Sequence, residues 1–202
     1  MSDHAVEERQ SPTIMARGLR TARESRRLSQ RELASRVNVS PSLISQIEAG
    51  QSQPSVNTLY SIVSELDISM DELFGHQPSS VPEGRPMPMG RVPVVVRAAD
   101  RSRLRLETGV TWEQLATPDS EALDFMEVVY EVGGTSSREG TLMRHNSVEF
   151  ALLVSGALDV QVGFDVHHLE KGDSIAFGST VPHRLWNPGP VPAHAIWVVL
   201  PH

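Results

Sequence analysis

The amino-acid sequence of 202 residues contains no cysteine. Disulfides, iron–sulfur clusters, thiolate metal sites and cysteine nucleophiles are therefore excluded, and histidine and carboxylate side chains remain as metal ligands. The sequence has no run of about 18 apolar residues and no secretory signal, which predicts a cytoplasmic protein without a membrane partner. Hydrophobic residues at 39% and charged residues at 21% are typical of a folded globular chain.

Charge is distributed unevenly along the chain. The whole sequence carries −7 at neutral pH, and residues 97–202 hold eight basic against fourteen acidic side chains, or −6. Residues 16–40 hold seven arginines against two glutamates, a local charge of +5. The total acidity therefore does not exclude an anionic partner, because a basic patch is confined to the N-terminal part. The seven arginines are Arg17, Arg20, Arg23, Arg26, Arg27, Arg31 and Arg36.

Residues 14–75 have apolar side chains at helical spacing and show no strand pattern. Ser29 followed by Glu32 is a capping-box signature, and Ser40 followed by Pro41 marks another helix start. These signals, with the turn residues between them, predict a helical domain. We expect five short helices over residues 13–26, 30–37, 41–49, 55–66 and 70–74.

The remainder of the chain has a different pattern. Residues 76–96 contain five prolines, a composition that extends the chain and predicts a linker. Short β-rich runs separated by glycine-containing turns then indicate an antiparallel β-barrel or sandwich over residues 97–202. We expect residues 1–13 to be a disordered N-terminal arm. The β-rich runs are residues 94–96, 125–132, 148–154, 158–162, 174–177 and 195–200.

Residues 30–48 have the layout of a helix-turn-helix. Ala34 lies where the two helices approach closely, and Asn38 suits the turn because asparagine tolerates positive φ. The second helix of such a pair lies in the DNA major groove, where Gln46 can pair with adenine and Leu43 can contact a thymine methyl group. The predicted base-contacting residues are Ser40, Ser42, Leu43, Ser45 and Gln46. The predicted phosphate contacts are Gln30, Arg31 and neighbouring arginines.

Turn, capping and core positions occur together in residues 28–34 (LSQRELA) and 40–50 (SPSLISQIEAG), followed by Pro54 and Leu59. This combination resembles the Cro/lambda-repressor type, or XRE family, of five-helix DNA-binding domains. The resemblance implies that residues 14–75 bind a double-stranded DNA operator as part of a homodimer. The alternative is a domain of this fold that has lost DNA binding and serves as a scaffold.

Three residues of the β-domain offer metal-ligand chemistry, namely His145, Glu149 and His183. Two imidazoles and one carboxylate form the facial triad that suits Fe(II) and related divalent ions. Four residues along a straight strand span about 13 Å, which is too far for two ligands of one metal ion. A shared site therefore requires a bend near Asn146 and Ser147.

The sequences around these residues resemble the two motifs of the cupin family. They are HNSVEF (145–150), VSG (154–156), LEKGD (169–173) and PHRLWN (182–187). The resemblance implies a β-barrel of jelly-roll type with His145, Glu149 and His183 as ligands. Metal-binding cupins usually have a further histidine where this chain has Met143, so one of the usual ligands is missing.

One divalent metal ion, Fe, Mn, Ni or Zn, is accordingly a candidate cofactor. The alternative is a metal-free pocket in which the two histidines hydrogen-bond an effector or each other. The predicted effector pocket contains Met143, Arg138, Arg144 and Trp186, and its arginines would suit an anionic ligand.

The domain order predicts a one-component transcription regulator rather than an enzyme, with a small-molecule effector bound in the β-domain. Pairing of two such domains would place two recognition helices about 34 Å apart on a palindromic operator. The rival interpretation is a non-haem iron oxygenase or epoxidase with a vestigial helix-turn-helix domain, since a cupin epoxidase has a similar layout. A sugar isomerase of the cupin family fits less well because the ligand set is incomplete.

Overall fold

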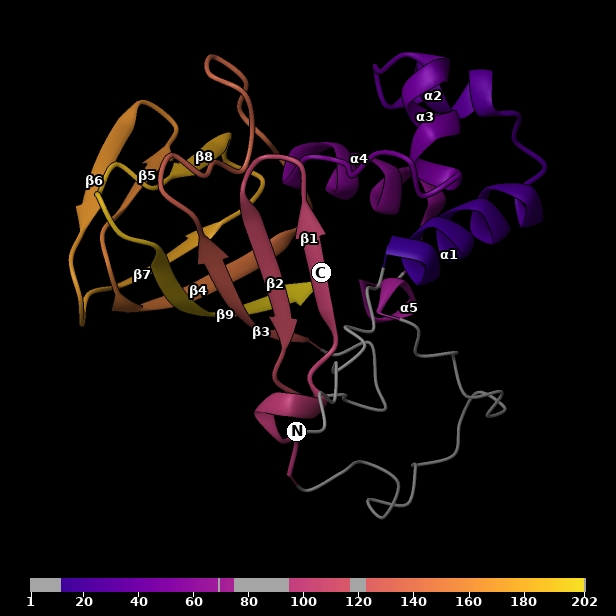
Figure 1. Ribbon diagram of the computed structural model, residues 1–202. Helices are drawn as coiled ribbons and strands as arrows, with labels where there is room; N and C mark the ends of the chain where they lie inside the picture. The colour runs from indigo at the N-terminus through magenta and orange to yellow at the C-terminus, as the bar shows by residue number, and fades with distance from the viewer. Residues whose placement is uncertain (1–11, 69, 75–94, 117–122, 202) are drawn as a thin grey trace, which may run out of the picture.

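The computed structural model describes residues 12–68, 70–74, 95–116 and 123–201. Helices form the N-terminal part and antiparallel strands form the C-terminal part, as expected from the sequence (Figure 1). Most of the predicted N-terminal arm and of the predicted linker lies outside the described residues, so both stay predictions. None of the described helices is both long enough and apolar enough to traverse a lipid bilayer.

The helical part contains α1 (Pro12–Ser25), α2 (Gln30–Arg36), α3 (Pro41–Glu48), α4 (Val56–Leu66) and the short α5 (Met70–Leu73). Ser29 Oγ accepts the Glu32 N–H while Glu32 accepts the Ser29 N–H, which confirms the predicted capping box. Ser40 caps α3, whose first residue is Pro41. Helix α1 begins at Pro12, inside the predicted disordered arm, because proline suits the first position of a helix.

The turn between α2 and α3 has the predicted conformation. Asn38 has a φ of 54°, in the left-handed region that asparagine tolerates. Val39 donates its N–H to the Ala34 carbonyl at 2.9 Å, which closes the turn. Ala34 is fully buried, and Ile44 and Ile47 of α3 pack into the same core. The apolar side of α3 therefore faces inward and its polar side faces outward.

The described part of the C-terminal domain contains β1 (Arg103–Leu106), β2 (Val110–Gln114), β3 (Asp124–Tyr130), β4 (Ser147–Ser155), β5 (Leu158–Val162), β6 (Asp165–Leu169), β7 (Ser174–Gly178), β8 (His183–Trp186) and β9 (Ala193–Pro201). These strands form one antiparallel sheet in the order β1-β2-β3-β9-β4-β7 and a second in the order β6-β5-β8. Leu153 and Trp197 of the larger sheet and Leu185 of the smaller sheet are buried in the core.

The antiparallel β-domain is as predicted, but strand pairing among the described residues gives two separate sheets instead of a closed barrel. An isolated pairing of Met143 with His183 lies along β8, at the edge of the smaller sheet, and does not connect the two sheets. The two sheets are held together by their buried apolar faces.

The start of the β-domain differs from the prediction. Residues 95–97 are not in a strand, and a 3-10 turn (Ala98–Asp100) follows them. Strands β1 and β2 were not predicted. In β1, Leu104 and Leu106 are buried while the arginines between and before them face outward, an alternation of only four residues. The apolar run at 94–96 was the stronger composition signal, but Val95 is 58% exposed and contributes little to the core.

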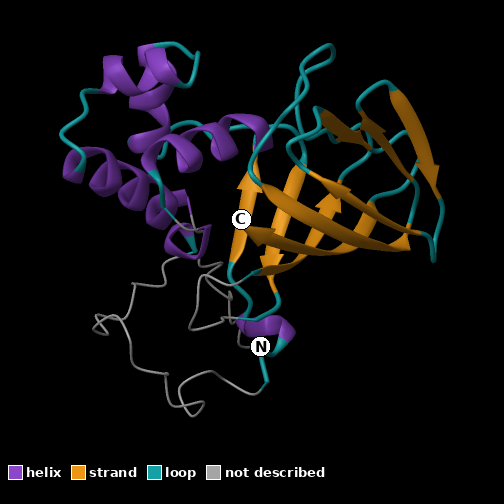
Figure 2. Ribbon diagram, turned by 180° about the vertical axis from the view of Figure 1, so that it is seen from behind, coloured by secondary structure: helices purple, strands orange, loops and turns teal. Residues whose placement is uncertain are grey.

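Helix α4 lies between the other helices and the β-domain (Figures 1 and 2). Two backbone hydrogen bonds attach its beginning to the β-domain. Asn57 donates its N–H to the Ser136 carbonyl at 3.1 Å, and Glu107 donates its N–H to the Pro54 carbonyl at 3.1 Å. The helical domain therefore meets the β-domain through α4.

Candidate DNA-binding surface and candidate metal centre

Helix α3 presents a polar edge to solvent. Ser42, Ser45 and Gln46 are exposed, and Leu43 is half-buried. Ser40 is also exposed, and its hydroxyl oxygen accepts the Leu43 N–H at 3.1 Å, so this predicted base contact also caps the helix. The isoleucines of α3 face the core, and the backbone contacts with the β-domain are made at the beginning of α4, so the exposed polar edge of α3 is left open to a partner among the described residues.

A buried charged pair holds α3 against the other helices. Arg23 of α1 donates from Nε to Glu48 Oε1 at 2.6 Å and from Nη2 to Glu48 Oε2 at 2.9 Å. The hydrogen bond to Glu48 raises the pKa of Arg23 against the effect of burial. Gln30 donates from Nε2 to Glu48 Oε2 at 2.9 Å, which places this predicted phosphate contact half-buried beside the exposed Arg31. The orientation of α3 is therefore set by contacts with α1 and α2.

Ion pairs reduce the positive charge that the predicted basic patch offers to a partner. Arg20 pairs with Glu24 at 2.9 Å, Arg23 with Glu48 at 2.6 Å, Arg26 with Asp67 at 3.8 Å, and Arg36 with Glu65 at 2.7 Å. Three of these four partners lie outside residues 16–40, so the local charge count missed them. Arg17, Arg27 and Arg31 are exposed and have no ion-pair partner among the residues described. These three arginines remain available for phosphate groups.

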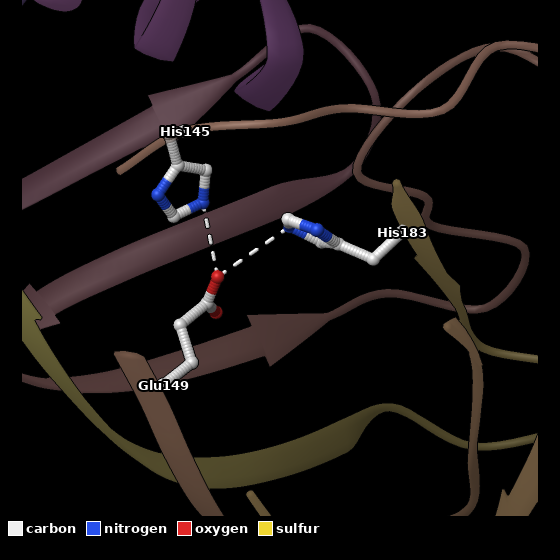
Figure 3. Close-up of side chains that lie close together, drawn as sticks. All are labelled: His145, Glu149 and His183. Carbon is white, nitrogen blue, oxygen red and sulfur yellow. Dashed lines mark ion pairs between the residues drawn. The ribbon is translucent and has the colours of Figure 1, made fainter. Parts of the chain in front are cut away.

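The three predicted metal ligands converge inside the β-domain (Figure 3). The chain bends at Asn146, so His145 precedes β4 and its ring turns back toward Glu149 within that strand. His145 Nε2 lies 2.9 Å and His183 Nε2 lies 3.4 Å from Glu149 Oε1. One ligand atom of each residue lies within 4.8 Å of the other two. The bend required by the sequence is therefore present.

The two histidines are oriented by bonds to their outer nitrogens. Ser147 Oγ lies 2.5 Å from His145 Nδ1, and the Val181 carbonyl lies 2.9 Å from His183 Nδ1. Because a carbonyl only accepts, His183 Nδ1 donates, and burial lowers the pKa of His183 and favours a neutral ring with a lone pair on Nε2. Both Nε2 atoms are buried without a hydrogen bond of acceptable geometry to any described residue.

Glu149 is held by two donors that sequence reasoning did not find. Ser179 Oγ donates to its Oε1 at 2.5 Å, and Trp197 Nε1 donates to its Oε2 at 2.6 Å. Burial acts to raise the pKa of Glu149, but its contact with His145 and its hydrogen bond with Ser179 lower it, and the net shift is downward. An ionised carboxylate faced by two imidazole nitrogens fits a divalent cation, and three ligands leave coordination positions open.

A small pocket adjoins this centre. It is lined mainly by apolar and aromatic side chains, including Val56, Tyr60, Trp112, Tyr130, Met143 and Trp197. Of the predicted effector-pocket residues, Met143 lines this pocket, whereas Arg138 and Arg144 are exposed. Trp186 points away from it because side chains alternate along β8, and the Arg184 guanidinium lies 5.0 Å from the Trp186 ring centre. The lining of this pocket is therefore mainly aromatic and apolar, and the assignment of Met143, Arg138, Arg144 and Trp186 to an effector pocket stays a prediction.

Tyr60 of α4 is a site residue that the sequence analysis missed. Its ring stacks on the His145 ring with the centroids 4.1 Å apart and the planes 4° apart. It also meets Trp112 edge to face, at 5.6 Å. Burial and the charge of Glu149 raise the pKa of Tyr60, so its phenol stays neutral. The sequence signal that could have indicated this role is the spacing of Val56 and Tyr60, which lie four residues apart and therefore on one face of the helix.

Comparison with known proteins gives matches to both domains. Two family models match, one described as helix-turn-helix over residues 19–73 and one as cupin domain over residues 126–199. The HTH-type transcriptional regulator PuuR of Escherichia coli (strain K12) is 25% identical over 166 residues, which cover 82% of this chain and 83% of the relative. A crystal structure of an HTH_3 family transcriptional regulator from Vibrio cholerae superposes with a TM-score of 0.65 at 23% identity, covering 94% of this chain and 96% of that one.

Hydroxypropylphosphonic acid epoxidase from S. wedmorenis is also similar, with a TM-score of 0.46 at 19% identity over 94% of this chain and 97% of that one. This likeness is too low to extend to activity, and the likeness to the V. cholerae structure concerns the fold alone. The two matched ranges include helix α3 and the three candidate metal ligands. The chain therefore consists of an XRE-type helix-turn-helix domain joined to a C-terminal cupin domain.

Proposed function

We propose that this protein is a sequence-specific DNA-binding transcriptional regulator of the cytoplasm whose cupin domain senses a small-molecule effector. The observation that carries this proposal is the exposed polar edge of α3, which stays free while α4 contacts the cupin domain. The similarity to PuuR of E. coli, an HTH-type transcriptional regulator, supports it. We assign DNA binding to residues 14–75, the linker to residues 76–96 and effector sensing to residues 97–202.

Base contacts come from the exposed side of α3 and phosphate contacts from its surroundings. Gln46 is long enough to form two hydrogen bonds with an adenine edge, and Leu43 suits a thymine methyl group. The shorter Ser40, Ser42 and Ser45 donate or accept at neighbouring positions. Gln30, Arg31 and the unpaired arginines of the basic patch contact the backbone and set the orientation of the domain.

Selection of genomic DNA fragments by the purified protein tests this proposal. We expect an enriched palindromic motif, with Gln46→Ala losing about 1–3 kcal/mol of discrimination at one base position. Arg17→Ala should weaken binding to all sequences alike and reduce its salt dependence. Ser64→Ala, on the exposed side of α4, is the matched control and should leave both properties unchanged. Absence of an enriched motif, with or without chelator and candidate metabolites, would contradict the proposal.

We also propose that the cupin domain holds one divalent metal ion, Fe, Mn, Ni or Zn, through His145, Glu149 and His183. Elemental analysis of protein purified without an affinity tag should give about one equivalent, and His183→Gln should remove it. His194→Gln is the control, since His194 is 40% exposed and pairs with Glu127 away from the centre. Less than about one tenth of an equivalent in the unmodified protein would exclude a tightly bound ion.

The outer face of the larger sheet supports a homodimer. Phe150 and Leu152 of β4 are 44% and 46% exposed, and they pair with Val198 and Ile196 of β9 to form an apolar strip. In our proposal the two-fold axis passes through this strip and the two α3 helices read successive turns of an operator, about 34 Å apart. Light scattering should show a dimer that Leu152→Glu dissociates and Val132→Glu, at another exposed position, does not. A monomeric unmodified protein would overturn this arrangement.

A second candidate function, a non-haem iron oxygenase, is favoured by the three-ligand centre. It requires stoichiometric Fe(II) for turnover and predicts that His183→Ala abolishes turnover. The regulator instead requires an operator, and its Gln46→Ala variant loses discrimination whatever happens at the metal centre. Measuring turnover and operator discrimination in both His183→Ala and Gln46→Ala separates the two functions.

A further inference from the structure

Helix α4 belongs to the cores of both domains. Leu59, Ile62 and Leu66 are buried in the helical core. Val56 and Tyr60 lie on another face and line the pocket beside the metal centre. Two backbone hydrogen bonds also attach the beginning of α4 to the cupin domain. Since α4 is packed in the helical core, it cannot leave the pocket without moving the DNA-binding domain.

The contact between Tyr60 and His145 joins the two sites directly. The rings are stacked at 4.1 Å and nearly parallel, while His145 Nε2 points to Glu149 Oε1 at 2.9 Å. One face of a candidate metal ligand is therefore covered by a side chain of the DNA-binding domain. The edge of Trp112 fixes the Tyr60 ring from another direction.

We infer that Tyr60 is the positioning residue through which occupancy of the metal centre is transmitted to the DNA-binding domain. This inference rests on the proposed regulatory function and names the contact that performs the regulation. Tyr60 acts through the ring of His145, so its effect depends on keeping an aromatic ring at this position.

The physical basis is the electronic change that a bound cation causes in an imidazole. His145 would hold a cation through Nε2, while its ring face is covered by Tyr60. A bound cation would draw electron density from the imidazole and so would strengthen the attraction to the electron-rich face of tyrosine. Metal binding therefore stabilises the docked position of α4, and by linkage docking strengthens metal binding by the same factor.

The docked position is the one that suits an operator. In it the polar edge of α3 is exposed and the DNA-binding domain has one orientation relative to the cupin domain. Two paired cupin domains hold their α3 helices at a defined separation only while both α4 helices stay docked. Occupancy of the centre should therefore raise operator affinity by about 5- to 150-fold, the usual range of coupling between sites.

Hydrogen exchange of the full chain tests the contact without DNA. The probe is Zn(II), which is redox-inert, added to the metal-free protein and to the variants Tyr60→Leu, Tyr60→Phe and Ser64→Ala. Zn(II) should slow amide exchange over residues 56–60 in the unmodified protein, in Tyr60→Phe and in Ser64→Ala, but not in Tyr60→Leu. Tyr60→Met replaces Tyr60→Leu if the latter does not fold. Equal slowing in Tyr60→Leu, or no slowing or no Zn(II) binding in the unmodified protein, would overturn the inference.

Operator affinity with and without Zn(II) tests the transmission. The unmodified protein and Tyr60→Phe should bind the selected operator more tightly with Zn(II), whereas Tyr60→Leu should bind it equally in both conditions. An equal gain in Tyr60→Leu, or no gain in the unmodified protein, would overturn the role of Tyr60 while leaving DNA binding intact. Absence of any operator binding would instead overturn the proposed function, and the exchange experiment would still decide on the contact.

Discussion

The two domains differ in how their buried polar groups are satisfied. In the DNA-binding domain, the Arg23 and Glu48 side chains are 9% and 4% exposed and neutralise each other through two hydrogen bonds. In the cupin domain, His145 and His183 keep buried Nε2 atoms without a hydrogen-bond partner in the part of the chain that the structure describes. Both Nε2 atoms instead face Glu149 Oε1, at 2.9 Å and 3.4 Å, so the buried polar groups of the cupin interior converge on one carboxylate oxygen. The DNA-binding domain has its free hydrogen-bonding groups on the surface instead, where a large partner can reach them.

Removing one side of the buried pair should break this contrast and give the largest effect. Glu48→Ala leaves the buried Arg23 charge with only the Leu28 carbonyl and, at 3.6 Å, the exposed Glu24, and we expect a loss of about 3 kcal/mol in the free energy of unfolding of the helical domain. Urea unfolding followed by circular dichroism at a helix-sensitive wavelength measures it. The double variant Arg23→Met with Glu48→Leu should lose far less, because no charge is left unpaired. A Glu48→Ala protein as stable as the unmodified one would show that the pair is not desolvated.

Removing a hydrogen-bond donor of Glu149 tests the same comparison in the cupin domain. Trp197→Phe keeps an aromatic ring but deletes the Nε1–H that donates to Glu149 Oε2. We expect metal affinity to fall about 10- to 100-fold, as for other hydrogen bonds that orient metal ligands. Competition of the protein with a chelator for Zn(II) gives the affinity. Trp186→Phe, on the outward side of β8, is the control, and equal affinities for both variants would contradict the role given to Trp197.

The exposed capping box of α2 should give the smallest effect. The Ser29 N–H donates to Glu32 and lowers the pKa of Glu32 from 4.5, so the folded state favours the charged form. The resulting stabilisation is complete above the unfolded pKa and is lost as pH falls through the lower folded pKa. Glu32→Gln should flatten the pH dependence of the urea midpoint in this acidic window. The control is Glu139→Gln, at an exposed position of the cupin domain, which should keep the pH dependence of the unmodified protein. If Glu32→Gln also keeps this pH dependence, the capping box does not contribute to stability.

The helical domain was more predictable than the cupin domain. Caps such as Ser29 with Glu32, and the positive φ of Asn38, act within a few residues, so their signals are visible in the sequence. The strands lacked such local markers. Strand β1 was missed because four alternating residues give a weak pattern, and the apolar run at 94–96 was misleading because Val95 has no core to pack against.

The sequence singled out three candidate metal ligands that the structure brings together, whereas the effector pocket stays a prediction. His145, Glu149 and His183 carry a chemical signature that can be recognised without coordinates. Arg138 and Arg144 are close to them in sequence but are exposed: Arg138 lies between a bend and a turn, and Arg144 points away from its neighbour Met143, which is buried.

The sequence by itself determined the order of the two domains, the five helices to within a residue or so at each end and the polar edge of α3, because capping and periodicity are properties of neighbouring residues. The tertiary structure alone decided which arginines stay unpaired, that His145 and His183 approach Glu149, and that Tyr60 covers His145. The physical reason is that these contacts join distant parts of the chain. They exist only once the two sheets and α4 have packed together.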